Sequence, residues 1–247
     1  MNLLIDLGNS RLKWAISDDN HLKIQDPLLH SAITPLVLKT LWYELCPNKV
    51  AISSVGNKTI LSLIAQTIRE LWSEVPIHFS QSRQQAFGVK NGYLEPEKLG
   101  VDRWLALIAA WQKLHSAVCI IDCGTAITVD FLNQNGEHQG GFICAGLSLM
   151  RNTLAINTAD LPLTVSTHNI GLATETQTAI FNGTLFAACG LIEKTMSQLP
   201  ENTSLLLTGG DAPLISKQLN HPFILEADLV LQGLAFELNS LSFQKIT

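Results

Sequence analysis

Hydrophobic and polar positions alternate along two segments of the chain, at residues 12–16 and 127–131. This period of two is typical of β-strands. Each segment follows a short run of mostly branched apolar residues, at 3–5 and 118–121, which indicates a buried strand. The pattern therefore predicts two β-hairpins in separate halves of the chain.

Both hairpins turn at the same short sequence. Ile5-Asp6-Leu7-Gly8 stands in the first hairpin and Ile121-Asp122-Cys123-Gly124 in the second. One Asp-x-Gly turn by itself is common, because Asp accepts hydrogen bonds from the backbone that follows it. Two such turns, each after a buried strand, predict a duplicated nucleotide-handling domain. Turn amides and hydroxyls surround a polyphosphate in this arrangement, while the Asp holds a cation or its water.

The remaining elements follow from the same periodicities. We expect further strands at 49–55, 75–79 and 205–207, and helices at 58–72, 104–114, 147–156, 174–199 and 228–240, with residues 136–143 and 223–225 as further segments of the second lobe. Residues 80–99 show no sustained period, and a loop of this length suggests a function. The alternation predicts an α/β protein with two lobes, at 1–114 and 115–247.

Composition supports a compact protein. The chain has 247 residues, of which 47% are hydrophobic and 15% charged. No apolar run approaches the ~20 residues that span a bilayer, and the N-terminus lacks the pattern of a secretory signal. The net charge of −5 comes without basic clusters, which disfavours nucleic acid as the main ligand.

Cysteine and histidine give no sign of a metal centre. The five cysteines are odd in number and lack paired zinc spacing, which is typical of reduced thiols in a cytoplasmic protein. The histidines are scattered, and none is paired at i, i+4.

The strongest candidate site outside the two turns lies at the end of the aperiodic segment 80–99 and in the residues just after it. Tyr93, Gly100, Asp102 and Arg103 combine an aromatic face, a closely approachable backbone, a base and an anion anchor. A structural alternative stays open, since Asp at the mouth of a helix also satisfies its first amides. Arg103 beside it also fits a surface ion pair.

A third strand-to-glycine turn occurs near the C-terminus, at Thr208-Gly209-Gly210-Asp211. This turn is compatible with a position beneath a nucleoside. It fits an ordinary link between a strand and a helix equally well.

The order and spacing of three motifs resemble those of type III pantothenate kinases, which belong to the acetate kinase, sugar kinase and actin superfamily. The motifs are residues 6–13, 100–103 and 122–125. Asn-Gly-Tyr ending at Tyr93 and the glycine-rich run at 140–146 also resemble the family. Ser10 stands where the family often has Thr, and Ala145 where it usually has Pro.

This resemblance implies two duplicated actin-like, or ribonuclease H-like, lobes, each a mixed sheet with flanking helices. It implies ATP-dependent phosphorylation of pantothenate to 4′-phosphopantothenate, the first step of coenzyme A biosynthesis. Asp102 resembles the general base. Asp6 resembles the residue that organises Mg²⁺, and Asp122 the ligand of a monovalent cation, K⁺ or NH₄⁺.

The resemblance also assigns the remaining contacts. The ATP-binding residues would be Asp6, Gly8, Asn9, Ser10, Lys13, Gly124 and Thr125. The substrate-binding residues would be Tyr93, Gly100, Val101, Arg103 and Thr176. Thr176 is a choice over Thr174 and Thr178, and an ordinary solvated residue at a helix start is its alternative.

Pantothenate and ATP are the implied partners, together with a second copy of the chain, since the family is dimeric. The apolar helices around 147–156 and 179–191 are the candidates for that interface, although such stripes are also typical of a core. Two other functions remain open: another small-molecule kinase of the superfamily, and a non-catalytic regulator of the Bvg accessory factor type.

Overall fold

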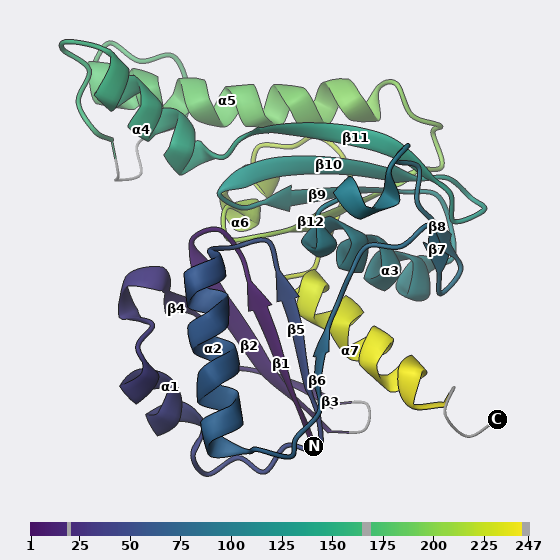
Figure 1. The fold of residues 1–247 in the computed structure, drawn as a ribbon. Coiled ribbons are helices and arrows are strands. Elements are labelled where there is room, and N and C mark those ends of the chain that lie inside the picture. The colour runs from purple at the N-terminus through teal and green to yellow at the C-terminus, as the bar shows by residue number, and fades with distance from the viewer. Residues whose placement is uncertain (19–20, 165–168, 244–247) are drawn as a thin grey trace. The chain divides into compact units, whose positions relative to one another are not determined.

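The computed structural model describes residues 1–18, 21–164 and 169–243 (Figure 1). The chain forms two compact units. Met1–Lys113 and the chain from Asp228 onward make the first unit, and Leu114–Ala227 make the second.

The first unit is built on a mixed sheet with the order β3-β2-β1-β5-β6. Its strands are β1 (Asn2–Leu7), β2 (Arg11–Asp18), β3 (His21–Ile24), β5 (Val50–Ser54) and β6 (Ile77–Phe79), and β4 (Leu28–Leu29) pairs with β2. β1 runs antiparallel to β2 and parallel to β5, and β5 runs parallel to β6. The period-two segment at 12–16 is thus the second strand of a hairpin.

The second unit repeats this arrangement, with the order β11-β10-β9-β12-β13. Its strands are β9 (Val118–Cys123), β10 (Ala126–Leu132), β11 (His138–Ala145), β12 (Ser204–Thr208) and β13 (Ile224–Leu225). β9 is antiparallel to β10 and parallel to β12, and β12 is parallel to β13. The two sheets therefore match strand by strand, which confirms the duplication expected from the two turns.

The first unit also contains α-helices. They are α1 (Pro35–Trp42), α2 (Lys58–Leu71), α3 (Val101–Leu114) and α7 (Leu229–Phe243). Buried side chains of β1, β2 and β5 form one core with those of α1 and α2. Glycine at 233 lets α7 approach α3 closely, because a Cβ there would lie 2.7 Å from the carbonyl carbon of Leu105.

Three helices belong to the second unit: α4 (Leu147–Asn157), α5 (Thr176–Met196) and α6 (Ala212–Ser216). The core joins alternate residues of β9, β10 and β12 to the buried face of α5, from Phe181 to Met196. Figure 1 shows α5 running along this sheet, with α4 beside its N-terminal half.

The structure corrects the expected division of the chain. The second lobe does not extend over 115–247, because α7 contacts β1, β2 and β5 and so belongs to the first unit. Sequence proximity to β13 suggested the opposite assignment. The apolar side chains of α7 are instead buried by a sheet that is distant in sequence.

Residues 80–99 contain more order than their composition suggests. A short hairpin, β7 (Gln85–Ala86) and β8 (Val89–Lys90), is followed by the 3-10 helix η2 (Pro96–Lys98). The hairpin turns through positive φ at Phe87 (55°) and Gly88 (82°), which two-residue hairpin turns require. Hydrophobic periodicity also did not predict α1, α6, β3, β4 or the 3-10 helix η1 (His30–Ala32).

Helices in the described parts of the chain are too short or too polar to cross a bilayer. All five cysteines are free thiols.

Candidate active site

The first Asp-x-Gly turn joins β1 to β2. Asp6 stands opposite Lys13 in the strand register and is only 7% exposed. The turn closes through a hydrogen bond of 3.1 Å from the Gly8 amide to the Arg11 carbonyl. A Cβ at Gly8 would meet only that carbonyl oxygen, at an ordinary 3.5 Å. Packing around this position therefore does not by itself require glycine.

Two residues that contact this turn or its second strand, His30 and Asp228, were not expected from the sequence. His30 holds the turn from outside: its Nε2 lies 3.1 Å from the Gly8 carbonyl, and its amide donates to the Ser10 carbonyl. Lys13 lies 3.7 Å from Asp228, just before α7. No local pattern marks His30 or Asp228, because both act across long separations in the chain.

Asp102 is the second residue of α3, which begins three residues earlier than its apolar pattern indicates. Its Oδ1 accepts a hydrogen bond of 2.8 Å from the Arg103 amide, so the carboxylate does satisfy a first-turn donor. A Cβ at Gly100 would lie 2.5 Å from the same Oδ1. A side chain at position 100 would therefore displace this carboxylate.

This segment lies beside the first turn. A Cβ at Gly100 would be 3.8 Å from Cγ1 of Val55, and the Val55 amide donates to the Leu7 carbonyl at 3.1 Å. The first unit thus brings the end of β1, which carries Asp6, close to the start of α3, which carries Asp102.

Arg103 and Tyr93 are in direct contact. The buried Arg103 guanidinium donates to the Tyr93 hydroxyl at 2.7 Å, and its carbon lies 5.5 Å from the ring centroid. Tyr93 is itself placed by buried Asn91, whose Oδ1 accepts from the Tyr93 amide at 3.0 Å. The aromatic face and the cation expected from the sequence therefore form one preorganised group.

The second Asp-x-Gly turn is enclosed by the third glycine turn. Asp122 and Thr208 are register partners on β9 and β12, and the Asp211 amide donates to the Cys123 carbonyl at 3.0 Å. Gly209 has a φ of +92°, and a Cβ there would collide with Asp122 Oδ1. The 208–211 segment is therefore part of the surroundings of Asp122.

The glycine-rich run at 140–146 also supports this second turn. The Gly146 amide donates to the Thr125 carbonyl at 2.9 Å, and a Cβ at Gly146 would lie 2.6 Å from that oxygen. Glycine at 146 therefore lets the start of α4 pack directly on the backbone of Thr125.

Each of the two turns carries one carboxylate. Mg²⁺ in kinases is bound through one or two carboxylates together with substrate phosphates and water, and Asp6 supplies one carboxylate. Asp122 has glycines on both sides, with a Cβ at Gly124 reaching 3.3 Å from its Oδ1. No cluster of three or more His, Cys, Asp or Glu side chains occurs within the described residues.

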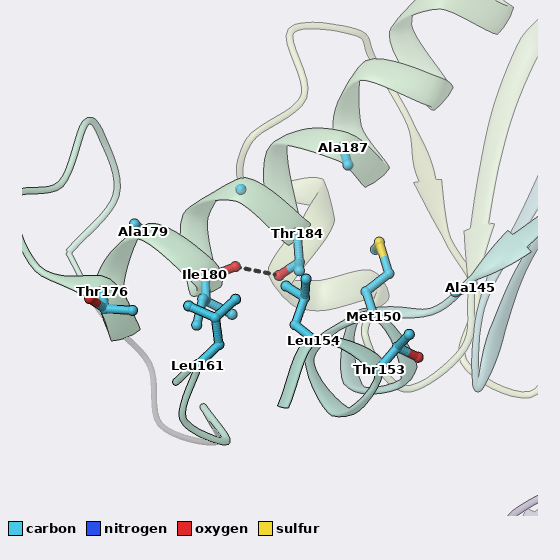
Figure 2. Close-up of a pocket in the computed structure, with 11 residues that line it drawn as sticks. Ala145, Met150, Thr153, Leu154, Leu161, Thr176, Ala179, Ile180, Thr184 and Ala187 are labelled. Atoms are coloured by element: carbon cyan, nitrogen blue, oxygen red, sulfur yellow. Dashed lines mark hydrogen bonds between the residues drawn. The ribbon is translucent and has the colours of Figure 1, made fainter. Parts of the chain in front are cut away.

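Thr176 lines a pocket of about 680 Å³ between α4 and α5 (Figure 2). Most of its wall is apolar, and Met150, Leu154 and Ile180 contribute to it. The Thr178 hydroxyl is engaged elsewhere, because it donates to the helix-capping Glu175 at 2.6 Å. Of the three neighbouring threonines, Thr176 is the one that lines the pocket.

Arg151 joins the two helices behind this pocket. Its Nε donates to Thr184 at 3.0 Å, and its guanidinium carbon lies 4.3 Å from the Phe181 ring centroid. Burial lowers the pKa of this guanidinium, and Asp211 opposes the shift. These contacts fix α4 against α5 and so hold the pocket walls in place.

Known proteins match both the sequence and the fold. A family model described as type III pantothenate kinase matches residues 2–198. A type III pantothenate kinase from Nitrosococcus oceani is 36% identical, with 95% of this chain and 92% of that protein covered.

Among solved structures, a Baf family protein from Campylobacter jejuni matches with a TM-score of 0.61 and 20% identity, covering 97% of this chain and 99% of that one. An ethanolamine utilization protein from Carboxydothermus hydrogenoformans matches with a TM-score of 0.53 and 10% identity, covering 95% and 88%. These two likenesses concern the fold alone. Together with the matching sheets, they support the two-lobed actin-like arrangement.

Proposed function

Because the chain belongs to the type III pantothenate kinase family, we propose that the two turns and residues 93–103 carry out the family's reaction. That reaction is the ATP-dependent phosphorylation of pantothenate to 4′-phosphopantothenate, the first step of coenzyme A biosynthesis. The observation that carries the residue assignment is the group at the start of α3, where Gly100 leaves Asp102 approachable and Arg103 contacts Tyr93. The regulatory alternative is not favoured.

Asp102 acts as the general base. Phosphoryl transfer passes through a loose transition state, so positioning and charge stabilisation provide most of the catalysis. A carboxylate is a weak base for an alcohol, and it therefore takes the hydroxyl proton late in the reaction. Because the Arg103 amide holds Oδ1 at 2.8 Å, the carboxylate orientation is fixed before substrate binds.

Pantothenate combines a carboxylate with an apolar gem-dimethyl group. Arg103 supplies donors for its polar acceptors, and the Tyr93 ring covers an apolar face. Backbone at Gly100 and Val101 lies at short range. In the second unit, Thr176 lines the apolar pocket and is the proposed substrate contact of that unit.

Each of the two turns supplies groups of the kind that bind the phosphates of ATP. Backbone and hydroxyl donors come from Gly8, Asn9, Ser10, Gly124 and Thr125, as in other phosphate-binding turns. Lys13 adds a positive charge in the strand register opposite Asp6. Mg²⁺, which Asp6 would hold, neutralises phosphate charge when it is bound.

Asp122 holds a monovalent cation, which supplies charge where the chain has few basic residues. We expect activity to require K⁺ or NH₄⁺ and to fall at least about tenfold when Na⁺ replaces it, the size of effect typical of lost electrostatic stabilisation. Asp122→Asn should abolish the difference between K⁺ and Na⁺. Steady-state rates across salts of equal ionic strength measure this. Equal rates of the wild-type protein in K⁺ and Na⁺ would contradict the cation role.

The protein also forms a homodimer through an exposed face of α4. Leu149 and Ile156 are exposed apolar residues seven positions apart on this helix, which also lines the apolar pocket that contains Thr176. Exposed apolar patches of this kind mark protein interfaces.

Ile156→Lys should convert the dimer to a monomer, because it places a charge in the interface at a position 80% exposed in the single chain. Sedimentation velocity measures the change in mass. Leu36→Lys is the matched control, since Leu36 is 75% exposed on α1 of the first unit. A wild-type monomer, or equal masses for both variants, argues against the proposed interface.

A cytoplasmic location is consistent with the five free thiols.

One assay tests the proposed function directly. Purified protein is incubated with ATP, Mg²⁺, K⁺ and pantothenate, and 4′-phosphopantothenate is quantified by mass spectrometry. Sugars and short carboxylic acids in parallel reactions test the other kinase activities. Absence of phosphopantothenate under these conditions would exclude the proposed function. Faster phosphorylation of a sugar or a short carboxylic acid would show that the substrate belongs to that class instead.

A further inference from the structure

A fully buried carboxylate lies on α7, outside the residues assigned above. Glu237 is 0% exposed, and its Oε2 accepts a hydrogen bond of 2.5 Å from the Ser80 hydroxyl. Its Oε1 faces two basic side chains, with His78 Nε2 at 3.6 Å and Arg83 at 3.9 Å. Glu237 therefore ties α7 to the end of β6 and to the beginning of the segment that carries Tyr93.

A carboxylate is energetically unfavourable at this buried position. Burial of a charge costs several kcal/mol unless partners compensate it, and an apolar side chain often stabilises such a site better. The neighbouring core residues of α7, Leu234 and Leu238, are apolar. Glu237 therefore does more than fill space. Its carboxylate accepts the hydrogen bond from Ser80, and its negative charge attracts Arg83.

The contacts continue from Arg83 along the segment. The Arg83 carbonyl accepts from Asn91 Nδ2 at 3.2 Å, and the same amide group donates to the Pro96 carbonyl at 3.1 Å. Nearby, the Ser82 hydroxyl donates to the Leu99 carbonyl at 2.8 Å. Buried Asn91 thus links both ends of the stretch on which Tyr93 stands.

The last contacts in this path involve the two residues proposed to bind the substrate. Asn91 Oδ1 accepts from the Tyr93 amide at 3.0 Å, and the Tyr93 hydroxyl accepts from Arg103 at 2.7 Å. A continuous path of contacts therefore joins Glu237 to Arg103, through Arg83, Asn91 and Tyr93. All of these residues lie in the first unit.

We propose that Glu237 is a positioning residue for pantothenate, acting through Ser80 and Arg83 to fix the segment that carries Tyr93. This inference rests on the proposed function, in which Tyr93 and Arg103 contact the substrate. Release of the segment loosens the Tyr93–Arg103 pair without touching the carboxylate of Asp102. The expected defect is therefore selective for pantothenate.

The test uses Glu237→Gln and Arg83→Met in the full-length protein. Gln keeps an acceptor for Ser80 but loses the attraction to Arg83, and Arg83→Met removes the partner from a half-exposed position, which favours normal folding. Glu70→Gln is the matched control, because it removes the acid of a surface ion pair with Lys39 in the same unit.

We expect both variants to raise KM for pantothenate by about 3- to 10-fold, the equivalent of one lost hydrogen bond. KM for ATP and kcat should stay within about twofold of wild type. Limited trypsin digestion should cut faster after Lys90 and Lys98, as read by mass spectrometry. Glu70→Gln should change none of these values.

Three outcomes would overturn the proposal: an unchanged KM for pantothenate in both variants, equal increases of both KM values, or unchanged cleavage after Lys90 and Lys98. If Glu237→Gln does not fold, Arg83→Met and Ser80→Ala decide by the same measurements. A wild-type protein that makes no phosphopantothenate refutes the proposed function instead, and faster cleavage in the variants would still show that Glu237 holds the segment.

Discussion

Asp102→Asn should lower kcat for pantothenate phosphorylation by about 10²–10⁴-fold, which is the usual loss on removal of a general base. The substitution keeps the shape of the side chain and an oxygen that can accept from the Arg103 amide. Binding should therefore change little, and KM for pantothenate and ATP should stay within about threefold of wild type. Initial rates at varied concentrations of each substrate separate these effects.

The control for this variant is Asp26→Asn, which makes the same chemical change at an exposed side chain before β4. It should retain the wild-type kcat. Wild-type activity of Asp102→Asn would remove Asp102 as the base while leaving the kinase assignment intact. A large loss in both variants would point to a general effect of charge instead.

Gly209→Ala should have the largest effect among the glycine substitutions near Asp122. The backbone there has a φ of +92°, and an added Cβ would lie 2.5 Å from the carbonyl carbon of Cys123 and collide with Asp122 Oδ1. Strain and forced contact together should lower the free energy of unfolding by roughly 2–5 kcal/mol. The displaced Asp122 should also weaken activation by K⁺. Urea unfolding and the K⁺ dependence of the rate measure the two effects.

Gly210→Ala is a close control, since a Cβ at Gly210 has no neighbour within 4 Å and its φ is not positive. It should change the free energy of unfolding by less than about 1 kcal/mol, as expected for a Gly to Ala change without strain. Equal free energies of unfolding for Gly209→Ala and Gly210→Ala would contradict the close packing of this turn on Asp122.

The hairpins at 12–16 and 127–131 could be predicted because a period of two is a local signal with a direct physical cause. Leu12 and Trp14, like Ile127 and Val129, lie on the strand face that meets the main core, and the residues between them are smaller or polar. The start of α3 could not be predicted in the same way. Its first turn contains Asp102 and Arg103, whose polarity interrupts the apolar pattern, although the helix begins at Val101.

Segments with weak periodicity were harder to predict. The hairpin within 80–99 depends on positive φ at Phe87 and Gly88, and Phe is not a residue that signals such a turn. The short helix α6 has only five residues, too few for a helical period to appear. These elements form because their surroundings bury or bond them.

By itself, the sequence determined the residue types at the two turns, their duplication and the family motifs that connect them to phosphoryl transfer. Tertiary structure alone decided that α7 completes the first unit, that Gly209 packs on Asp122 and that Glu237 supports the segment of Tyr93. The physical reason is separation along the chain. Ser80 and Glu237 meet across 157 positions, and a local pattern contains no information about partners so distant.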